Sequence, residues 1–281
     1  MKPIQYFVPK TMTEALSVLQ EYGPKVTIVA GGTDVVVNMH HGKLKPEVIV
    51  YIGNLGLEEI KEEGNHLVLG ALTKIAAIAA SSLLKKKAPL LPMAASSLGN
   101  PLTRNQATVG GNLVSASPAA DMAIGLLGLD GEVTLVSSRG QRQVALADFF
   151  TGYRQTVKKA DELLTAIRIP LKDIKGTFLK LGRRQASSLS VVNVSCALSI
   201  SQGGNCEEAR LTLGAMAPTP IRATKAEGLL KGEKVTEALI EKAAQAAVDQ
   251  TQPIDDGRAT AWYRKKAAQV LVARALKQSI S

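Results

Sequence analysis

The chain has 281 residues, of which 46% are hydrophobic, and this length and composition predict a globular protein with two or three lobes. Aromatic residues make up 4%, too few to favour a protein that stacks the bases of single-stranded nucleic acid. The net charge of +10 is dispersed, and its densest cluster, Lys85–Lys87, follows a helix-like stretch, where cations offset the helix dipole. A docking face for an acidic partner is the second interpretation of the charge, and nucleic acid is a distant third.

Residues that could form a metal site or a catalytic centre are sparse. Two cysteines, Cys196 and Cys206, cannot hold an iron–sulfur cluster or a Cys-rich zinc site, and we expect both to be reduced thiols. The histidines have no ligand motif around them, and no Ser/His/Asp motif indicates a nucleophilic triad. No apolar run reaches the length of a membrane span, and no signal peptide is visible. We therefore expect a soluble, cytoplasmic protein without a metal site or catalytic residues of its own.

The first elements in chain order predict a small α/β lobe over residues 1–54. Thr11 and Glu14 have the spacing of a capping box, apolar residues then recur on one helical face, and Gly23 ends the helix. The β-branched run at 25–30 predicts a buried strand, and a second strand is expected around 48–51.

A second lobe is expected over residues 55–170, with a strand at 67–69, a helix near 73–84, and a strand at 132–136 between two Gly-containing turns. A third domain is expected from 176 to 281. In it, Gly203–Gly204 separates two runs of alternating polarity, which predicts a hairpin. Helices follow, and the last is expected to place five residues near one face: Tyr263, Ala267, Val270, Leu271 and Ala275.

Two further glycine pairs predict a ligand site. They lie in Ala30-Gly31-Gly32-Thr33-Asp34 and in Thr108-Val109-Gly110-Gly111-Asn112. Adjacent glycines let the backbone approach a ligand without a Cβ in between, and consecutive N–H groups form a nest for an anion. Neither segment fits the Walker or the G-x-G-x-x-G pattern, so an ordinary P-loop or Rossmann domain is not predicted. A plain turn explains one such pair, whereas two together suggest one extended ligand with a diphosphate.

The run Ala107–Asp121 carries the most specific resemblance to a known family. Its Gly-Gly-Asn, short spacer, Ala-Ser-Pro and following Asp are similar to the FAD-binding subunit of the molybdenum hydroxylases, the xanthine dehydrogenase and carbon monoxide dehydrogenase family. The segments 30–34, 150–154, 161–164 and 180–184 fall in the family order, so the resemblance extends over nearly the whole chain. It implies an α+β fold, with a two-lobed FAD-binding domain of the vanillyl-alcohol-oxidase/PCMH type followed by a C-terminal α+β domain of sheet and helices.

The resemblance implies FAD as the cofactor. The residues that it places around FAD are Ile28, Val29, Ala30, Gly31, Gly32, Thr33, Asp34, Val35, Thr108, Gly110, Gly111, Asn112, Asp121, Leu164 and Lys180. The Asp34 carboxylate is expected to fix its loop rather than face a diphosphate, since like charges repel. Asp121 is implied near the adenosine and Lys180 beside the flavin ring. Tyr153 is either structural or adjacent to the flavin.

The function that the resemblance implies is electron transfer. Electrons would reach FAD from an iron–sulfur subunit, which receives them from a molybdopterin subunit, and would pass to NAD or another acceptor. One alternative is a self-contained FAD oxidoreductase on the same fold, which would need its own substrate lobe. A second alternative is a non-enzymatic basic binding protein, which would carry no flavin. The substrate of the complex is implied to be chosen by the molybdenum subunit.

Overall fold

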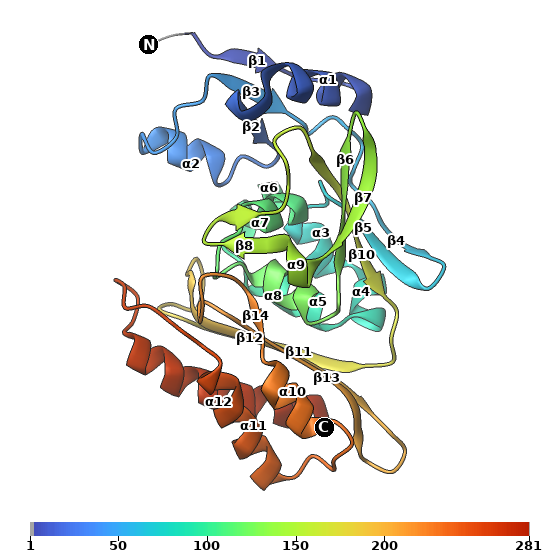
Figure 1. Cartoon of the computed structure of the whole chain (residues 1–281), viewed down its shortest axis with the longest axis vertical. Coiled ribbons are helices and arrows are strands. Elements are labelled where there is room, and N and C mark those ends of the chain that lie inside the picture. Colours follow the sequence, from blue (N-terminus) through green and yellow to red (C-terminus); the bar gives the residue numbers. More distant parts are fainter. Residues whose placement is uncertain (1–2, 281) are drawn as a thin grey trace.

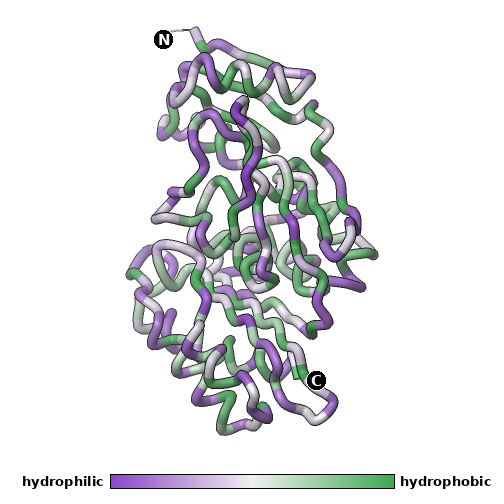
Figure 2. Tube along the Cα trace, turned by 45° about the vertical axis from the view of Figure 1, so that its right-hand side comes forward, coloured by the Kyte–Doolittle hydropathy of each residue, from purple (hydrophilic) through white to green (hydrophobic). Residues whose placement is uncertain are grey.

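The computed structural model describes residues 3–280 and shows three main sheets, of three, five and four strands, that follow one another along the longest axis of the molecule (Figure 1). Each sheet has its own cluster of buried hydrophobic side chains. Figure 2 shows hydrophobic stretches in all three parts of the trace rather than in one of them alone. The fold is therefore built around three neighbouring cores, and the chain passes through them in order.

The first sheet is parallel and has the strand order β1-β3-β2, with β1 at Gln5–Phe7, β2 at Val26–Val29 and β3 at Val48–Tyr51. Helix α1 (Met12–Tyr22) begins as predicted, because the Thr11 side chain accepts a hydrogen bond from the Glu14 N–H at 3.2 Å. It ends at Gly23, whose φ of 51° suits glycine. A 3-10 turn (Gly23–Lys25) leads into β2, and α2 (Val35–His40) follows it.

The second sheet has five antiparallel strands in the order β4-β5-β10-β6-β7. Their bounds are Ile60–Glu63 (β4), His66–Gly70 (β5), Glu132–Ser137 (β6), Gly140–Ala145 (β7) and Leu163–Pro170 (β10). The strands expected at 67–69 and 132–136 are thus confirmed. A separate two-stranded ribbon pairs β8 (Phe150–Gly152) with β9 (Gln155–Thr156).

Seven short helices pack beside this sheet: α3 (Ile75–Ala80), α4 (Ser82–Lys87), α5 (Leu90–Ser97), α6 (Pro101–Gln106), α7 (Val109–Val114), α8 (Asp121–Leu127) and α9 (Leu146–Phe149). The single helix expected near 73–84 is wrong, because the chain breaks at Ser81 and that side chain caps α4 by accepting from the Leu84 N–H at 3.2 Å. Lys85–Lys87 do occupy the last turn of α4, as predicted.

The third sheet is antiparallel, with β11 (Lys175–Gly182), β12 (Ser190–Ile200), β13 (Cys206–Gly214) and β14 (Ile221–Arg222) in sequence order. The hairpin predicted at Gly203–Gly204 joins β12 to β13. Helices α10 (Thr224–Leu230), α11 (Glu237–Asp249) and α12 (Ala261–Ile280) complete this part (Figure 1). The sheet contacts α12 and α10 as well as α5 and α8 of the preceding part, so it lies between the two groups of helices.

The buried face of helix α12 differs from the one predicted. Tyr263 and Val270 are about half exposed, and Arg264 is buried instead, with 1% of its surface accessible. The Arg264 guanidinium donates to the carbonyl oxygen of Val191 at 2.6 Å and to the Asp256 carboxylate at 2.7 Å. A buried cation is stable only when such partners compensate the loss of water, and sequence periodicity does not show those partners.

Both cysteines are buried and free, which confirms the expectation of two thiols. Burial raises the pKa of Cys196 to about 12, so its thiol is protonated at neutral pH. Among residues 3–280, no helix is long and apolar enough to cross a membrane.

The Asp256 site provides a test of what fixes α12. Asp256 accepts hydrogen bonds from Arg258 and Arg264, and these contacts lower its pKa below the usual range. We expect Asp256→Asn to lower the free energy of unfolding by about 1–3 kcal/mol at pH 7, because Arg264 loses its counter-ion. The difference from wild type should shrink below about pH 4, where the unfolded carboxyl takes up a proton.

Urea unfolding across a pH series measures this difference. Glu241→Gln, at an exposed acid on α11, is the matched control and should have little effect at any pH. Equal effects of the two substitutions would contradict the role given to Asp256.

Candidate functional site

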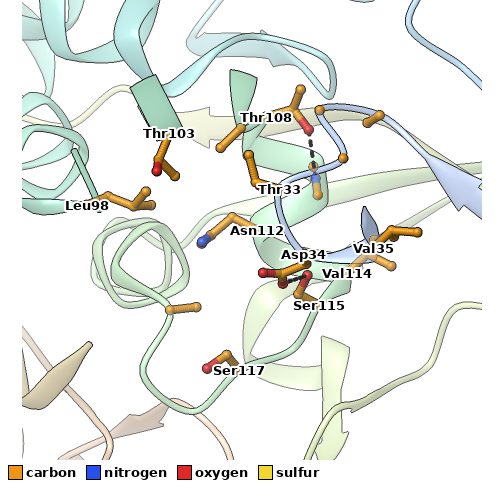
Figure 3. Close-up of a pocket in the computed structure, with 18 of the residues that line it drawn as sticks. Thr33, Asp34, Val35, Leu98, Thr103, Thr108, Asn112, Val114, Ser115 and Ser117 are labelled. Carbon is orange, nitrogen blue, oxygen red and sulfur yellow. Dashed lines mark hydrogen bonds between the residues drawn. The ribbon is translucent and has the colours of Figure 1, made fainter. Parts of the chain in front are cut away.

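A cavity of about 580 Å³ opens where the three parts of the molecule meet. Figure 3 shows Thr33 and Asp34 of the first glycine-containing segment beside Thr108 and Asn112 of the second on the cavity wall. Of the fifteen residues expected around a ligand, all line this cavity except Val29. Val29 lies on β2 between Ile28 and Ala30, and successive side chains of a strand point to opposite sides. The structure therefore brings together residues that lie as far as 152 positions apart (Ile28 and Lys180).

The first glycine pair makes a sharp turn that packs on the second lobe. A Cβ on Gly31 would overlap the carbonyl oxygen of Gln106, so glycine is required for this close approach. Gly32 has a φ of +72°, in the left-handed region. Within residues 3–280, no protein group accepts a hydrogen bond from the N–H groups of Gly31, Gly32, Thr33 or Asp34. Four backbone donors are thus free on the wall of the cavity.

The second glycine pair lies in a helix rather than in a turn. Gly110 and Gly111 form the first turn of α7, and the Thr108 side chain caps it by accepting from the Gly111 N–H at 3.1 Å. Gly110 lies against Ala71, where a Cβ would approach to 2.8 Å. A Cβ on Gly111 would meet only Thr108 Oγ1, at 2.9 Å, and is otherwise in open space. Gly111 therefore keeps the cavity wall free of a side chain.

Asp34 connects the two segments. Its Oδ2 accepts a hydrogen bond from the Ser115 hydroxyl at 2.6 Å, a contact between the first lobe and the end of α7 (Figure 3). The carboxylate thus fixes its loop, as expected.

Asn112 places an amide on the cavity wall. Its Oδ1 is buried and has no hydrogen-bond partner among the described residues. Figure 3 shows the amide nitrogen directed away from Asp34, toward the side where Leu98 and Thr103 lie. A buried polar atom without a partner costs free energy, so this side chain fits a site that is completed by a ligand.

Asp121 and Lys180 form a buried ion pair at one corner of the cavity. Lys180 Nζ lies 2.7 Å from Asp121 Oδ2, and the two side chains are 11% and 5% exposed. Burial raises the pKa of Asp121, and the contacts with Lys180, Asn193 and Ser190 oppose that shift. Because they are in contact, the two residues cannot serve opposite ends of an extended FAD. The structure thus places together two residues that the resemblance assigned to different parts of FAD, Asp121 near the adenosine and Lys180 beside the flavin.

Several lining residues were missed by sequence analysis. They are Leu98–Asn100 just before α6, Thr103 within α6, Arg154 between β8 and β9, Lys158 after β9, and Ser187–Leu189 just before β12. Asn100 followed by Pro101 is a typical helix start and could have been recognised. Lys158 carries no local motif; it donates to the carbonyl oxygen of Glu162 at 3.0 Å, and burial lowers its pKa. Tyr153 is 64% exposed and does not line the cavity.

Comparison with known proteins identifies the family. Residues 2–172 match the FAD binding domain in molybdopterin dehydrogenase, and residues 177–279 match the CO dehydrogenase flavoprotein C-terminal domain. The chain is 33% identical to the nicotinate dehydrogenase FAD-subunit of Eubacterium barkeri, over 96% of this chain and 93% of the relative. It is 32% identical to the carbon monoxide dehydrogenase medium chain of Afipia carboxidovorans, over 98% and 96%.

Solved structures show the same architecture. Reconstituted CO dehydrogenase from Oligotropha carboxidovorans superposes with a TM-score of 0.96 and 31% identity, covering 99% of this chain and 98% of that chain. Quinoline 2-oxidoreductase from Pseudomonas putida 86 superposes with a TM-score of 0.93 and 27% identity, covering 100% and 98%. With both of its domains matched, the chain belongs to the FAD-binding subunits of the molybdenum hydroxylases, oxidoreductase complexes of several subunits, and FAD is its cofactor.

Proposed function

We propose that this chain is the electron-transfer subunit through which its complex delivers electrons to an external acceptor. An iron–sulfur subunit would supply the electrons from a molybdopterin subunit, and NAD or another acceptor would receive them. FAD supplies the redox chemistry, while the protein binds, orients and tunes it. The observation that carries the proposal is the cavity itself, whose wall holds both glycine pairs, the free backbone N–H groups of Gly31–Asp34 and the side chain of Asn112.

The proposal gives the substrate to another subunit. Relatives that are 33% and 32% identical over nearly the whole chain carry the names of a nicotinate and a carbon monoxide dehydrogenase. Such different substrates with one flavoprotein fold support a shared electron-transfer role. Within the described residues, no group of three or more His, Cys, Asp and Glu side chains could hold a metal ion. The proposal therefore assigns the molybdenum and the clusters to the partner subunits.

The two glycine segments are proposed to hold the diphosphate of FAD. The free N–H groups of Gly31–Asp34 provide uncharged donors, and the amide nitrogen of Asn112, on the side toward Leu98 and Thr103, provides another. Asp34 does not oppose the diphosphate, because its carboxylate is bonded to Ser115. Gly111 leaves the space between these donors open.

The corner with Asp121 and Lys180 is proposed to receive the flavin ring. Lys180 lines the cavity and is the cation of a buried pair, so its field reaches a bound ring through protein rather than through water. Leu164, on β10, is buried at the cavity wall and offers an apolar surface for packing. The residues present thus fit a cofactor that carries both a diphosphate and a flat ring.

Gly111→Val should abolish FAD retention, because the branched side chain would occupy the open wall between the donors. The flavin content per folded chain, from absorbance after gel filtration, measures this. Gly228→Val is the matched control, since Gly228 is also helical and exposed and has open space around it. Full flavin content in a folded Gly111→Val protein would refute the two-segment site.

Lys180→Met should lower the midpoint potential of bound FAD, since reduced FAD is anionic and loses a nearby cation. A loss of about 1.4 kcal/mol is a tenfold change in the redox equilibrium, or about 30 mV for two electrons. Redox titration measures the shift, with the exposed Lys265→Met as the control on α12. If the potential is unchanged while FAD stays bound, Lys180 does not lie at the flavin.

Substrate should reduce the flavin only when the partner subunits are present. Because the proposal places the substrate site on the molybdopterin subunit, mixing the chain with its iron–sulfur and molybdopterin subunits should restore substrate-dependent bleaching of the flavin. The net charge of +10 predicts that association with an acidic partner face weakens as salt is added. Stopped-flow absorbance across a salt series tests both points. Reduction of the isolated chain by substrate would instead support a self-contained oxidoreductase.

A further inference from the structure

A row of buried polar side chains joins helix α8 to the C-terminal sheet. Ser190, Asn193 and Ser195 on β12, and Thr212 on β13, all have 0% of their surface exposed. Ser195 and Thr212 donate to the carbonyl oxygen of Ile124, at 3.0 and 2.9 Å. Ser190 and Asn193 donate to Asp121 Oδ1, at 2.9 and 2.7 Å. The C-terminal sheet thus contacts the first residue and the middle of α8 through hydrogen bonds.

Two glycines allow α8 to approach the sheet this closely. A Cβ on Gly128, at the end of α8, would overlap the Ser195 hydroxyl, and a Cβ on Gly214 would come within 2.7 Å of the Ile124 side chain of α8. The polar groups are therefore held at fixed positions by backbone packing on both sides. Asp121, as the first residue of α8, is thereby placed beside its donors on β12.

The donors around Asp121 indicate that its carboxyl is ionised. Lys180 and the Asn193 amide nitrogen can only donate, and the Ser190 hydroxyl is the one partner that could also accept. A carboxylate satisfied by three donors suits this environment better than a neutral acid. Lys180 is the one charged group that contacts Asp121 among the described residues.

Lys180 keeps one N–H for the cavity. Its ammonium donates to Asp121 Oδ2 at 2.7 Å and to the carbonyl oxygen of Ser97 at 3.0 Å. An ammonium has three donors, so one remains, and Lys180 lines the cavity wall. The position of that donor is set by Asp121 on one side and by the end of α5 on the other.

We propose that Asp121 is the counter-ion that positions Lys180 and cancels its charge, and that Ser190 and Asn193 are positioning residues that keep Asp121 ionised. Asp121 and Lys180 then act on the flavin as one neutral unit, and the potential of bound FAD reflects their difference rather than the lysine alone. This inference rests on the proposed place of the flavin beside Lys180. It gives the C-terminal sheet a role in tuning the cofactor, although the glycine segments belong to the other two parts.

Redox titration of single and double variants tests the charge balance. Lys180→Met should lower the midpoint potential and Asp121→Asn should raise it, each by at least tenfold in the redox equilibrium, or about 30 mV for two electrons. The midpoint potential of the double variant should differ from that of the wild type by less than a third of either single-variant shift. Shifts of the same sign in the single variants, or a double variant that matches Lys180→Met, would overturn the counter-ion role.

Ser190→Ala tests the positioning role with a smaller change. In Ser190→Ala, loss of one donor should raise the midpoint potential, in the same direction as Asp121→Asn. Ser190→Thr keeps a hydroxyl at this position and should have a potential close to that of the wild type. Ser195→Ala is the matched control, because this serine is equally buried on the same strand but bonds Ile124 and Thr212 instead. Equal potentials in Ser190→Ala and Ser195→Ala would show that Ser190 is only structural.

Melting of the FAD-free protein separates failure of this inference from failure of the proposed function. Asp121→Asn and Lys180→Met should each lower the melting temperature, and the double variant should recover much of the loss, because no unpaired charge remains. If the double variant recovers melting temperature but no variant shifts the midpoint potential, the ion pair is real and only the proposed place of the flavin beside Lys180 is refuted. If the loss of melting temperature in the double variant equals the sum of the two single losses, Asp121 and Lys180 do not act as a pair. Loss of FAD in Asp121→Asn alone would mean that Asp121 binds the cofactor directly, and would also overturn the proposal.

Discussion

The site depends on a contact between two backbones, in which the carbonyl oxygen of Gln106 occupies the space that a side chain on Gly31 would need. This contact brings the turn after β2 against the segment that leads into α7, and Asp34 reinforces it through Ser115. Because the first lobe approaches so closely, the free N–H groups of one segment and the amide of the other face the same cavity. Any larger residue at position 31 would separate the lobes before a ligand could bind.

The C-terminal part completes the cavity in a different way, through buried polar contacts rather than glycine turns. Lys180 comes from β11 and pairs with Asp121 at the start of α8. This ion pair therefore joins the C-terminal part to the preceding part at the cavity wall. A buried pair contributes little net stability, because desolvation offsets much of the attraction. Its value lies in geometry, since neither charge is stable in any other arrangement of the two parts.

Some of the positively charged side chains form ion pairs within the fold. Arg264, Arg222 and Arg142 each bond a carboxylate, on Asp256, Glu227 and Glu162 respectively. Other cations, such as those on the outer face of α12 and in the last turn of α4, are exposed. These exposed cations are the ones that the proposed association with an acidic partner face would use, and the relatives are named as subunits or chains of larger enzymes.

The sequence by itself determined the local features: the cap and end of α1, the hairpin at Gly203–Gly204, and both glycine pairs, since a few neighbouring residues decide each of these. Its resemblance to a family also indicated the cofactor. Only the tertiary structure decided that the second pair is helical, that Arg264 is buried, and that Asp121 and Lys180 meet. These outcomes depend on partners far away in the chain, such as Val191 for Arg264, and no local pattern of residues encodes where such partners lie.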